Sequence, residues 1–293
     1  MDADRFAVLK ILLEELNLKF VVTRIDGNRH FFIYPERLGF EPIIALLGYP
    51  PVAILRKIAN CRTILVAHYD RVKGSPGAND NSAAVFELIK AALTLKRNDI
   101  GNWLVIFTDK EELSIGESLK EQGAYSLAKA LKEVLIDKTH VFIFDCCGVG
   151  DTLIISTAVD HLLQNEESAN FARSRHLVAQ MRERALAAAR NIRLERVLLT
   201  PTPFSDDAGF FRAGLAAQTV TVLPAPEASE LVSLLRLKPE LAVALVSEQD
   251  GIEKDFIPKT WLCINGPDDR YETLTPRNFQ KITDFALALA GAF

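Results

Sequence analysis

Residues that commonly bind metal ions occur at four separated points of this 293-residue chain. His68 and Asp145 each come directly after a short apolar run, and Asp80 lies in a polar turn before an apolar stretch. The adjacent pair Glu111 and Glu112 follows a further apolar run. An imidazole combined with carboxylates is the mixed nitrogen and oxygen donor set of a zinc or similar divalent site. These residue types therefore favour metal-assisted chemistry.

Neighbouring residues indicate how the donors could be oriented. Asp70 stands two positions after His68 and is suited to accept the second ring N–H, which would fix the imidazole tautomer. The polar turn at 77–82 is also typical of a helix N-terminus, because Asp, Asn and Ser are preferred capping residues. Capping and metal bridging therefore both remain open for Asp80.

Glu111 and Glu112 repel one another unless protons or a cation compensate them. Because adjacent side chains should point in different directions, we expect one carboxylate to bind metal and the other to face the substrate as a general base. An exposed, solvated helix start is the alternative interpretation of the pair.

An α/β fold is needed to bring these residues together. Short apolar runs rich in β-branched residues alternate with stretches of helical periodicity, which predicts a sandwich around a mostly parallel sheet. Carboxyl ends of parallel strands meet at one edge, where such folds place their ligands. The predicted strands are 20–25, 30–34, 63–67, 103–108, 140–144, 152–156, 193–198 and 217–222. The predicted helices are 1–19, 82–96, 124–134, 168–189, 206–213 and 276–290.

The chain shows no repeat, low-complexity tract or Gly/Ser linker that would divide it. A single catalytic domain over residues 1–293 is therefore expected, since an α/β fold of this size can form one core. The segment 225–255 is helical and irregular, and we expect it to form an excursion, or lid, over the site.

Composition excludes several classes of function. The net charge of −4, with both signs interspersed, offers no concentrated basic surface, so nucleic acid is not an expected partner. No secretory signal pattern and no apolar run of roughly 18 to 20 residues is present, which predicts a cytoplasmic protein without a membrane partner. The cysteines have no zinc-ribbon or redox spacing, so buried free thiols are expected. A homo-oligomer remains open.

The order of these motifs resembles metallopeptidase family 28, the dinuclear-zinc aminopeptidases, which include glutamate carboxypeptidase and have glutaminyl cyclases as relatives. The family's His-x-Asp, Gly-Ala-x-Asp-Asn, Glu-Glu, strand-terminal Asp and Ser-Asp-His motifs have counterparts at 68–70, 77–83, 111–112, 145 and 205–215. The resemblance implies a three-layer α/β sandwich with a mixed, mostly parallel sheet, the zinc-dependent exopeptidase fold.

Carried over position by position, the resemblance implies one or two zinc ions per chain. His68 and Asp145 would hold one ion and Glu112 the other, with Asp80 as the bridging ligand. Asn265 stands where the family has its last histidine ligand. Because an amide oxygen is a weak ligand for zinc, we expect the second site to have low affinity, to hold another divalent metal or to be empty.

The resemblance also assigns catalytic roles. Glu111 would be the general base that takes a proton from the attacking water, and Asp70 would be the hydrogen-bond partner of His68. Two further positions depart from the family pattern: Asp207 replaces the histidine of the Ser-Asp-His motif, and Thr202 stands near an oxyanion-stabilising tyrosine of some members.

We therefore predict a zinc aminopeptidase that removes N-terminal residues from peptides or hydrolyses a related small amide. Two alternatives remain open. One is a mononuclear amidohydrolase or cyclase-like enzyme that uses His68, Asp80 and Asp145. The other is a catalytically silent family member, which the retained Glu111-Glu112 pair argues against, because clustered carboxylates without a metal cost stability.

Overall fold

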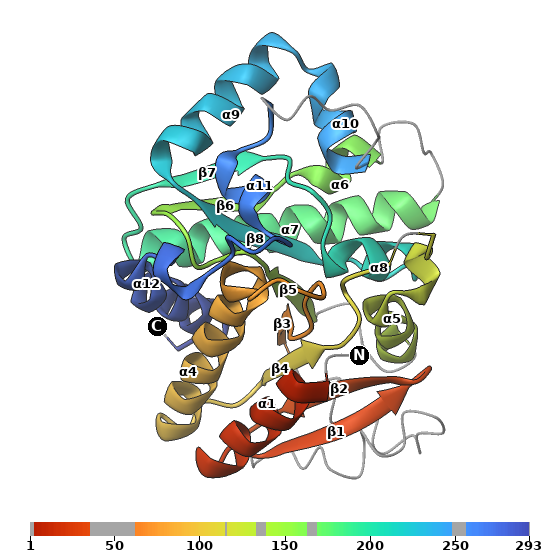
Figure 1. Ribbon diagram of the computed structural model, residues 1–293, viewed down its shortest axis with the longest axis vertical. Coiled ribbons are helices and arrows are strands. Elements are labelled where there is room, and N and C mark those ends of the chain that lie inside the picture. Colours follow the sequence, from red (N-terminus) through yellow and green to blue (C-terminus); the bar gives the residue numbers. More distant parts are fainter. Residues whose placement is uncertain are drawn as a thin grey trace.

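The computed structural model describes residues 3–35, 62–114, 116–132, 139–162, 169–247 and 256–292. Its described strands form one sheet in the order β1-β2-β4-β3-β5-β8-β6-β7, with helices on both faces (Figure 1). Strands β3, β4, β5 and β8 run parallel, as do β6 and β7, whereas the β1–β2, β2–β4 and β6–β8 pairs are antiparallel. The predicted α/β class with a mixed, mostly parallel sheet is confirmed.

The strand bounds are β1 Phe20–Ile25, β2 Asn28–Ile33, β3 Thr63–His68, β4 Trp103–Thr108, β5 His140–Phe144, β6 Thr152–Ser156, β7 Val197–Thr200 and β8 Gln218–Leu223. The helix bounds are α1 Ala3–Glu15, α4 Ala83–Arg97, α5 Gly123–Lys132, α6 Ala158–Leu162, α7 Ala169–Asn191, α8 Asp206–Arg212, α9 Ala225–Leu237, α10 Glu240–Ser247, α11 Lys259–Cys263 and α12 Pro276–Leu289.

Two hydrophobic clusters cover the two faces of the sheet. Alternate side chains of a strand point to opposite faces, so Leu65 packs with α1, α4, α7 and α12, whereas Ile64 and Val66 pack with α5 and α8. A third cluster joins β6 and β8 to α9, α10 and α11. The central strands β3, β4 and β5 are buried along almost their whole length, as expected for parallel strands covered on both sides.

Most predicted elements match these bounds within a few residues, but α6 and α11 were not predicted and the first helix, predicted to reach residue 19, ends at Glu15. We predicted a strand at 193–198, but α7 continues to Asn191 and Arg193 has a φ of 57°, so β7 starts only at Val197. The sequence pattern could not reveal this, because a short apolar run does not fix where a helix stops. The excursion at 225–255 contains α9 and α10, while its last part, 248–255, lies outside the described residues.

None of the described helices combines the length and hydropathy needed to cross a membrane.

Glu87 provides a test of this packing. It lies on α4 with no exposed surface, and neither of its carboxylate oxygens has a hydrogen-bond partner among the described residues. Burial therefore raises the pKa of Glu87 well above its usual value of 4.5.

A carboxyl whose pKa is raised by folding costs stability as the pH rises above 4.5, because the unfolded chain then loses its proton more readily than the folded chain. We expect Glu87→Gln to gain stability over the wild type progressively from pH 5 to pH 8 in urea unfolding. Glu230→Gln, on the exposed side of α9, is the control and should follow the wild type. An equal offset at every pH would contradict the argument.

Candidate metal centre

Three potential metal donors converge where β3 and β5 end. The Nε2 atom of His68 lies 3.0 Å from Asp80 Oδ1 and 3.6 Å from Asp145 Oδ1. Donors placed at about 2.0–2.2 Å from a tetrahedral zinc ion lie roughly 3.3–3.6 Å apart, a spacing that the Asp145 distance matches and the Asp80 distance falls short of. His68 Nε2 and Asp145 Oδ1 are buried without a hydrogen-bond partner in the described part of the chain. Because buried polar atoms are normally paired, these donors fit a divalent ion.

The turn that carries Asp80 is held from two sides. Asp269 accepts hydrogen bonds from the backbone N–H groups of Asn79, at 2.7 Å, and Asp80, at 3.0 Å. The side-chain amide of Asn81 donates to the carbonyl of Phe144 on β5, at 2.8 Å. No side-chain capping bond forms at the start of α4, so the capping interpretation of this turn lacks support.

Asp70 connects His68 to the loop after β4. Its Oδ1 atom lies 3.4 Å from His68 Nδ1, and its carboxylate accepts hydrogen bonds from the N–H groups of Glu111, at 3.2 Å, and Glu112, at 3.1 Å. Burial alone would raise the pKa of Asp70, but His68 and these two N–H groups lower it overall. An ionised Asp70 is therefore favoured at the position where it orients the imidazole.

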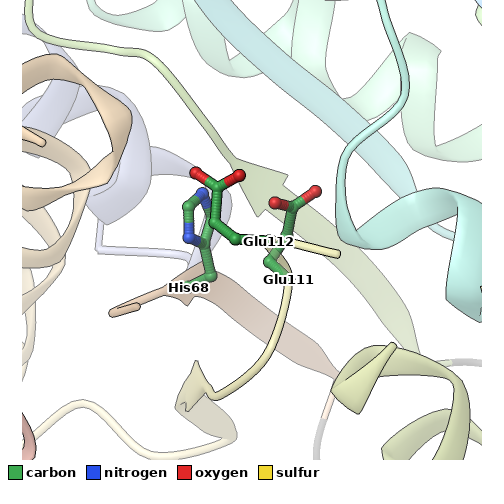
Figure 2. A group of neighbouring side chains, drawn as sticks. All are labelled: His68, Glu111 and Glu112. Atoms are coloured by element: carbon green, nitrogen blue, oxygen red, sulfur yellow. The ribbon is translucent and has the colours of Figure 1, made fainter. Parts of the chain in front are cut away.

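Glu111 and Glu112 extend into the same space beside His68. One donor atom of each carboxylate lies within 4.8 Å of the imidazole and of the other carboxylate, and both point away from the end of β4 (Figure 2). Our expectation that the two side chains diverge was wrong. That expectation assumed extended backbone, whereas Lys110 has a φ of 60° and the following N–H groups turn towards Asp70.

The cluster contains more carboxylates than one imidazole can balance. Burial would lower the pKa of His68, but Asp145, Asp70 and Asp80 together raise it well above 6.5. Burial raises the pKa of Glu112 to about 8, with Asp80 adding to the effect, and raises that of Glu111 well above 4.5. These groups must hold either protons or a cation, which is the electrostatic situation of a metal site.

Asn265 reaches the same cluster from the turn after α11. The end of its side-chain amide lies 2.7 Å from Glu112 Oε1 and 3.2 Å from Asp80 Oδ2, so a nitrogen at this position donates hydrogen bonds to both carboxylates. The opposite amide orientation would bring its oxygen against two carboxylate oxygens, so we assign the orientation that pairs both groups. Asn265 therefore lies beside Glu112 and Asp80, two of the predicted ligands, and its predicted role as a metal ligand stays a prediction.

Asp207 and Thr202, the two other positions that depart from the family pattern, form hydrogen bonds within the protein. Asp207 is buried and accepts a hydrogen bond from the N–H of Ser205, at 2.9 Å, and it belongs to neither group of potential metal donors. The hydroxyl of Thr202 is bonded to Ser156, at 2.8 Å, and to the carbonyl of Pro203. The hydroxyl of Thr202 is thereby already paired within the protein.

Sequence analysis missed the roles of two acids. Asp269 orients the turn of Asp80, but its neighbour Asp268 is also an aspartate, and nothing in the sequence distinguishes the buried one from the exposed one. Asp206 is buried and accepts a 2.5 Å hydrogen bond from Thr108, and burial raises its pKa to about 7. Its position in the Ser-Asp-Asp segment was the only available signal.

A cavity of about 880 Å³ opens onto the cluster. Its acidic lining includes Asp80, Glu111, Glu112 and Asp145. The apolar residues of its walls include Val72, Leu119, Phe204, Phe211, Val246 and Trp261. Val246 belongs to α10, so the excursion that begins at α9 contributes to the wall of this cavity.

Comparison with known families agrees with this arrangement. The model of peptidase family M28 matches residues 52–290, and the chain therefore belongs to this family. The resemblance found in the motifs is thereby confirmed. No curated protein sequence matches the chain.

Solved structures of related fold include enzymes of two kinds. A zinc aminopeptidase from Bacillus subtilis is 20% identical, with a TM-score of 0.52 over 89% of this chain and 48% of that one. The LapA aminopeptidase of Legionella pneumophila is 12% identical, with a TM-score of 0.56 over 98% and 62% of the two chains. A glutaminyl cyclase from Porphyromonas gingivalis is 11% identical, with a TM-score of 0.60 over 98% and 88%. The chain spans about half the length of the Bacillus enzyme.

Asp269 allows a test of how the turn positions Asp80. We expect Asp269→Asn to weaken Zn²⁺ binding by about 10- to 100-fold, because an amide cannot accept from both N–H groups with its two terminal atoms. Asp268→Asn is the matched control, since that side chain is 76% exposed. Chelator competition measures both affinities, and equal losses in the two variants would refute the role given to Asp269.

Metal removal should make the stability of the protein depend on pH. Without a cation, the raised pKa of Glu112, about 8 against 4.5, means that the folded chain holds a proton that the unfolded chain has lost. Stability of the metal-free protein should therefore fall as the pH rises from about 4.5 to 8. A bound cation favours the ionised carboxylates, so the difference in melting temperature between zinc-loaded and chelator-treated protein should widen across this range. Parallel curves would contradict this account.

Proposed function

We propose that this chain is a metal-dependent hydrolase of the aminopeptidase type, which cleaves the N-terminal residue from peptides or hydrolyses a related small amide. The observation that carries the proposal is the meeting of His68, Asp80 and Asp145, with donor atoms of His68 and Asp145 unpaired among the described residues, beside the half-buried carboxylate of Glu111. Family membership supports the same class of chemistry.

In this proposal His68, Asp80 and Asp145 hold a divalent ion, with zinc as the expected metal. Such an ion, when bound, polarises the scissile carbonyl and lowers the pKa of a water molecule. Asp70 holds the imidazole of His68 in place from the opposite ring nitrogen. The protein thus supplies both the ligands and the contact that orients one of them.

Glu111 is the proposed general base. It must take a proton from the attacking water and later release it to the leaving amine, which is easiest when its pKa lies nearer to neutrality than that of a free glutamate. Burial and the neighbouring carboxylates raise the pKa of Glu111 in this direction. Gln122 lies beside it, with its amide nitrogen 3.4 Å from Glu111 Oε1, and restricts where the carboxylate points.

The negative charge of the cavity favours binding of the N-terminal end of a peptide. The four carboxylates of the cluster exceed the charge of one divalent ion, and Arg212 is the only basic side chain among the described residues that line the cavity. Residual negative charge attracts an α-ammonium group and disfavours a terminal carboxylate. Apolar wall residues such as Phe211 and Trp261 suit an apolar side chain next to the scissile bond.

A cyclase-like activity is the second candidate. Of the structures compared above, the glutaminyl cyclase is matched over the largest share of its own chain, 88%. Both activities would need a buried carboxylate that moves a proton, so Glu111 alone does not distinguish them. Incubation with aminoacyl-arylamides, N-terminal glutaminyl ones among them, separates the two: arylamine release indicates a peptidase, and ammonia release without arylamine indicates a cyclase.

Glu111→Gln tests the role of the base. Because general base catalysis contributes about 10²- to 10⁴-fold, we expect kcat to fall by at least that factor while the Zn²⁺ content stays unchanged. Glu117→Gln is the matched control, since its carboxylate also lines the cavity but is held by Lys110, at 2.9 Å, and by the N–H of Ser114. Near-normal turnover in Glu111→Gln would reject the mechanism.

A further inference from the structure

The neutral side-chain amide of Asn265 lies between the carboxylates of Asp80 and Glu112. The two oxygens of the Asp80 carboxylate face different neighbours: Oδ1 lies 3.0 Å from His68 Nε2, and Oδ2 lies 3.2 Å from the amide nitrogen of Asn265. The same nitrogen lies 2.7 Å from Glu112 Oε1. An amide carries two N–H donors, so Asn265 can serve both carboxylates at once.

The two sides of Asp80 therefore differ in what they offer a cation. On the His68 side, an imidazole nitrogen and an oxygen of Asp145 are buried without hydrogen-bond partners. On the Glu112 side, one oxygen of each carboxylate, Glu112 Oε1 and Asp80 Oδ2, faces the Asn265 amide, which offers a cation at most one neutral oxygen. A second ion would have to turn the Asn265 amide and would gain from it only a neutral oxygen, which is a poor zinc ligand. His68 also lies within 4.8 Å of donor atoms of Glu111 and Glu112, but both groups of potential donors share this one imidazole, so a second zinc ion would have no histidine ligand of its own.

We propose that this chain binds a single divalent ion, through His68, Asp80 and Asp145, and that the amide of Asn265 takes the place of a second ion by bridging Glu112 and Asp80. The inference rests on the metal site of the proposed function and specifies its stoichiometry. Three protein ligands with an open fourth position form the composition of catalytic mononuclear zinc sites. Glu112 is then a positioning residue, which holds Asp80 through Asn265.

Metal stoichiometry tests this inference without reference to activity. Metal-free protein is titrated with Zn²⁺ in a calorimeter, and bound zinc is counted by mass spectrometry after dialysis. We expect one ion in the wild type and two in Asn265→His, which supplies an imidazole ligand next to Glu112. Asn98→His, which adds a histidine at the exposed C-terminal end of α4, is the matched control and should bind one ion.

Asn265→Asp covers the case in which the histidine variant does not fold, because it keeps the shape of the side chain and replaces the amide nitrogen with a carboxylate oxygen. It should also bind two ions, and its melting temperature should fall below that of the wild type without metal and recover with Zn²⁺. Circular dichroism confirms folding of each variant.

The outcomes separate this inference from the proposed function. Two tightly bound ions in the wild type would overturn the inference and leave the hydrolase proposal intact. One ion in both folded Asn265 variants would overturn the claim that the amide is what excludes a second ion. A wild type that binds no zinc, or that binds it equally well after His68→Ala, would overturn the metal site and both proposals with it.

Discussion

The carboxylate of Asp80 is the point on which the candidate site depends. It is almost fully buried, and its backbone N–H is held by Asp269, so its position is set by hydrogen bonds from another part of the chain. One of its oxygens faces His68 and the other faces Asn265. Burial of a carboxylate raises its pKa unless charge compensates it, and the pKa of Asp80 is raised here. A cation on the His68 side of Asp80 would offset the free-energy cost of burying this carboxylate in its ionised form.

Sheet order brings the remaining donors to Asp80. Strands β4, β3 and β5 are neighbours and run parallel, so residues that follow them reach one edge. This part was predictable from sequence, because the fully buried strands stand out as apolar runs and polar residues after them mark the edge. The predicted set of His68, Asp145 and the Glu111-Glu112 pair does meet within a few ångströms.

Details that depend on single backbone angles or on distant partners were not predictable. Donor atoms of Glu111 and Glu112 lie within 4.8 Å of each other although the residues are adjacent, and the loop that carries them has a positive φ at Lys110, which no residue type at that position signals. The choice of Asp269 over Asp268 as the buried partner depends on how the turn after α11 folds back onto Asn79. Asn265 was predicted to be a weak ligand, but only its surroundings show that it presents donors to two carboxylates.

Likeness of fold does not by itself decide the chemistry, since the related structures are only 11–20% identical and include both aminopeptidases and a glutaminyl cyclase. The distinction between aminopeptidase and cyclase chemistry must come from the charge at the site. In the proposed single-ion site, Glu112 and Asp80 would remain more basic than between two ions, because a second cation adds two positive charges next to Glu112 and the Asn265 amide adds none. A site of this kind relies more on its buried carboxylates, and less on metal charge, to move the proton that the reaction requires.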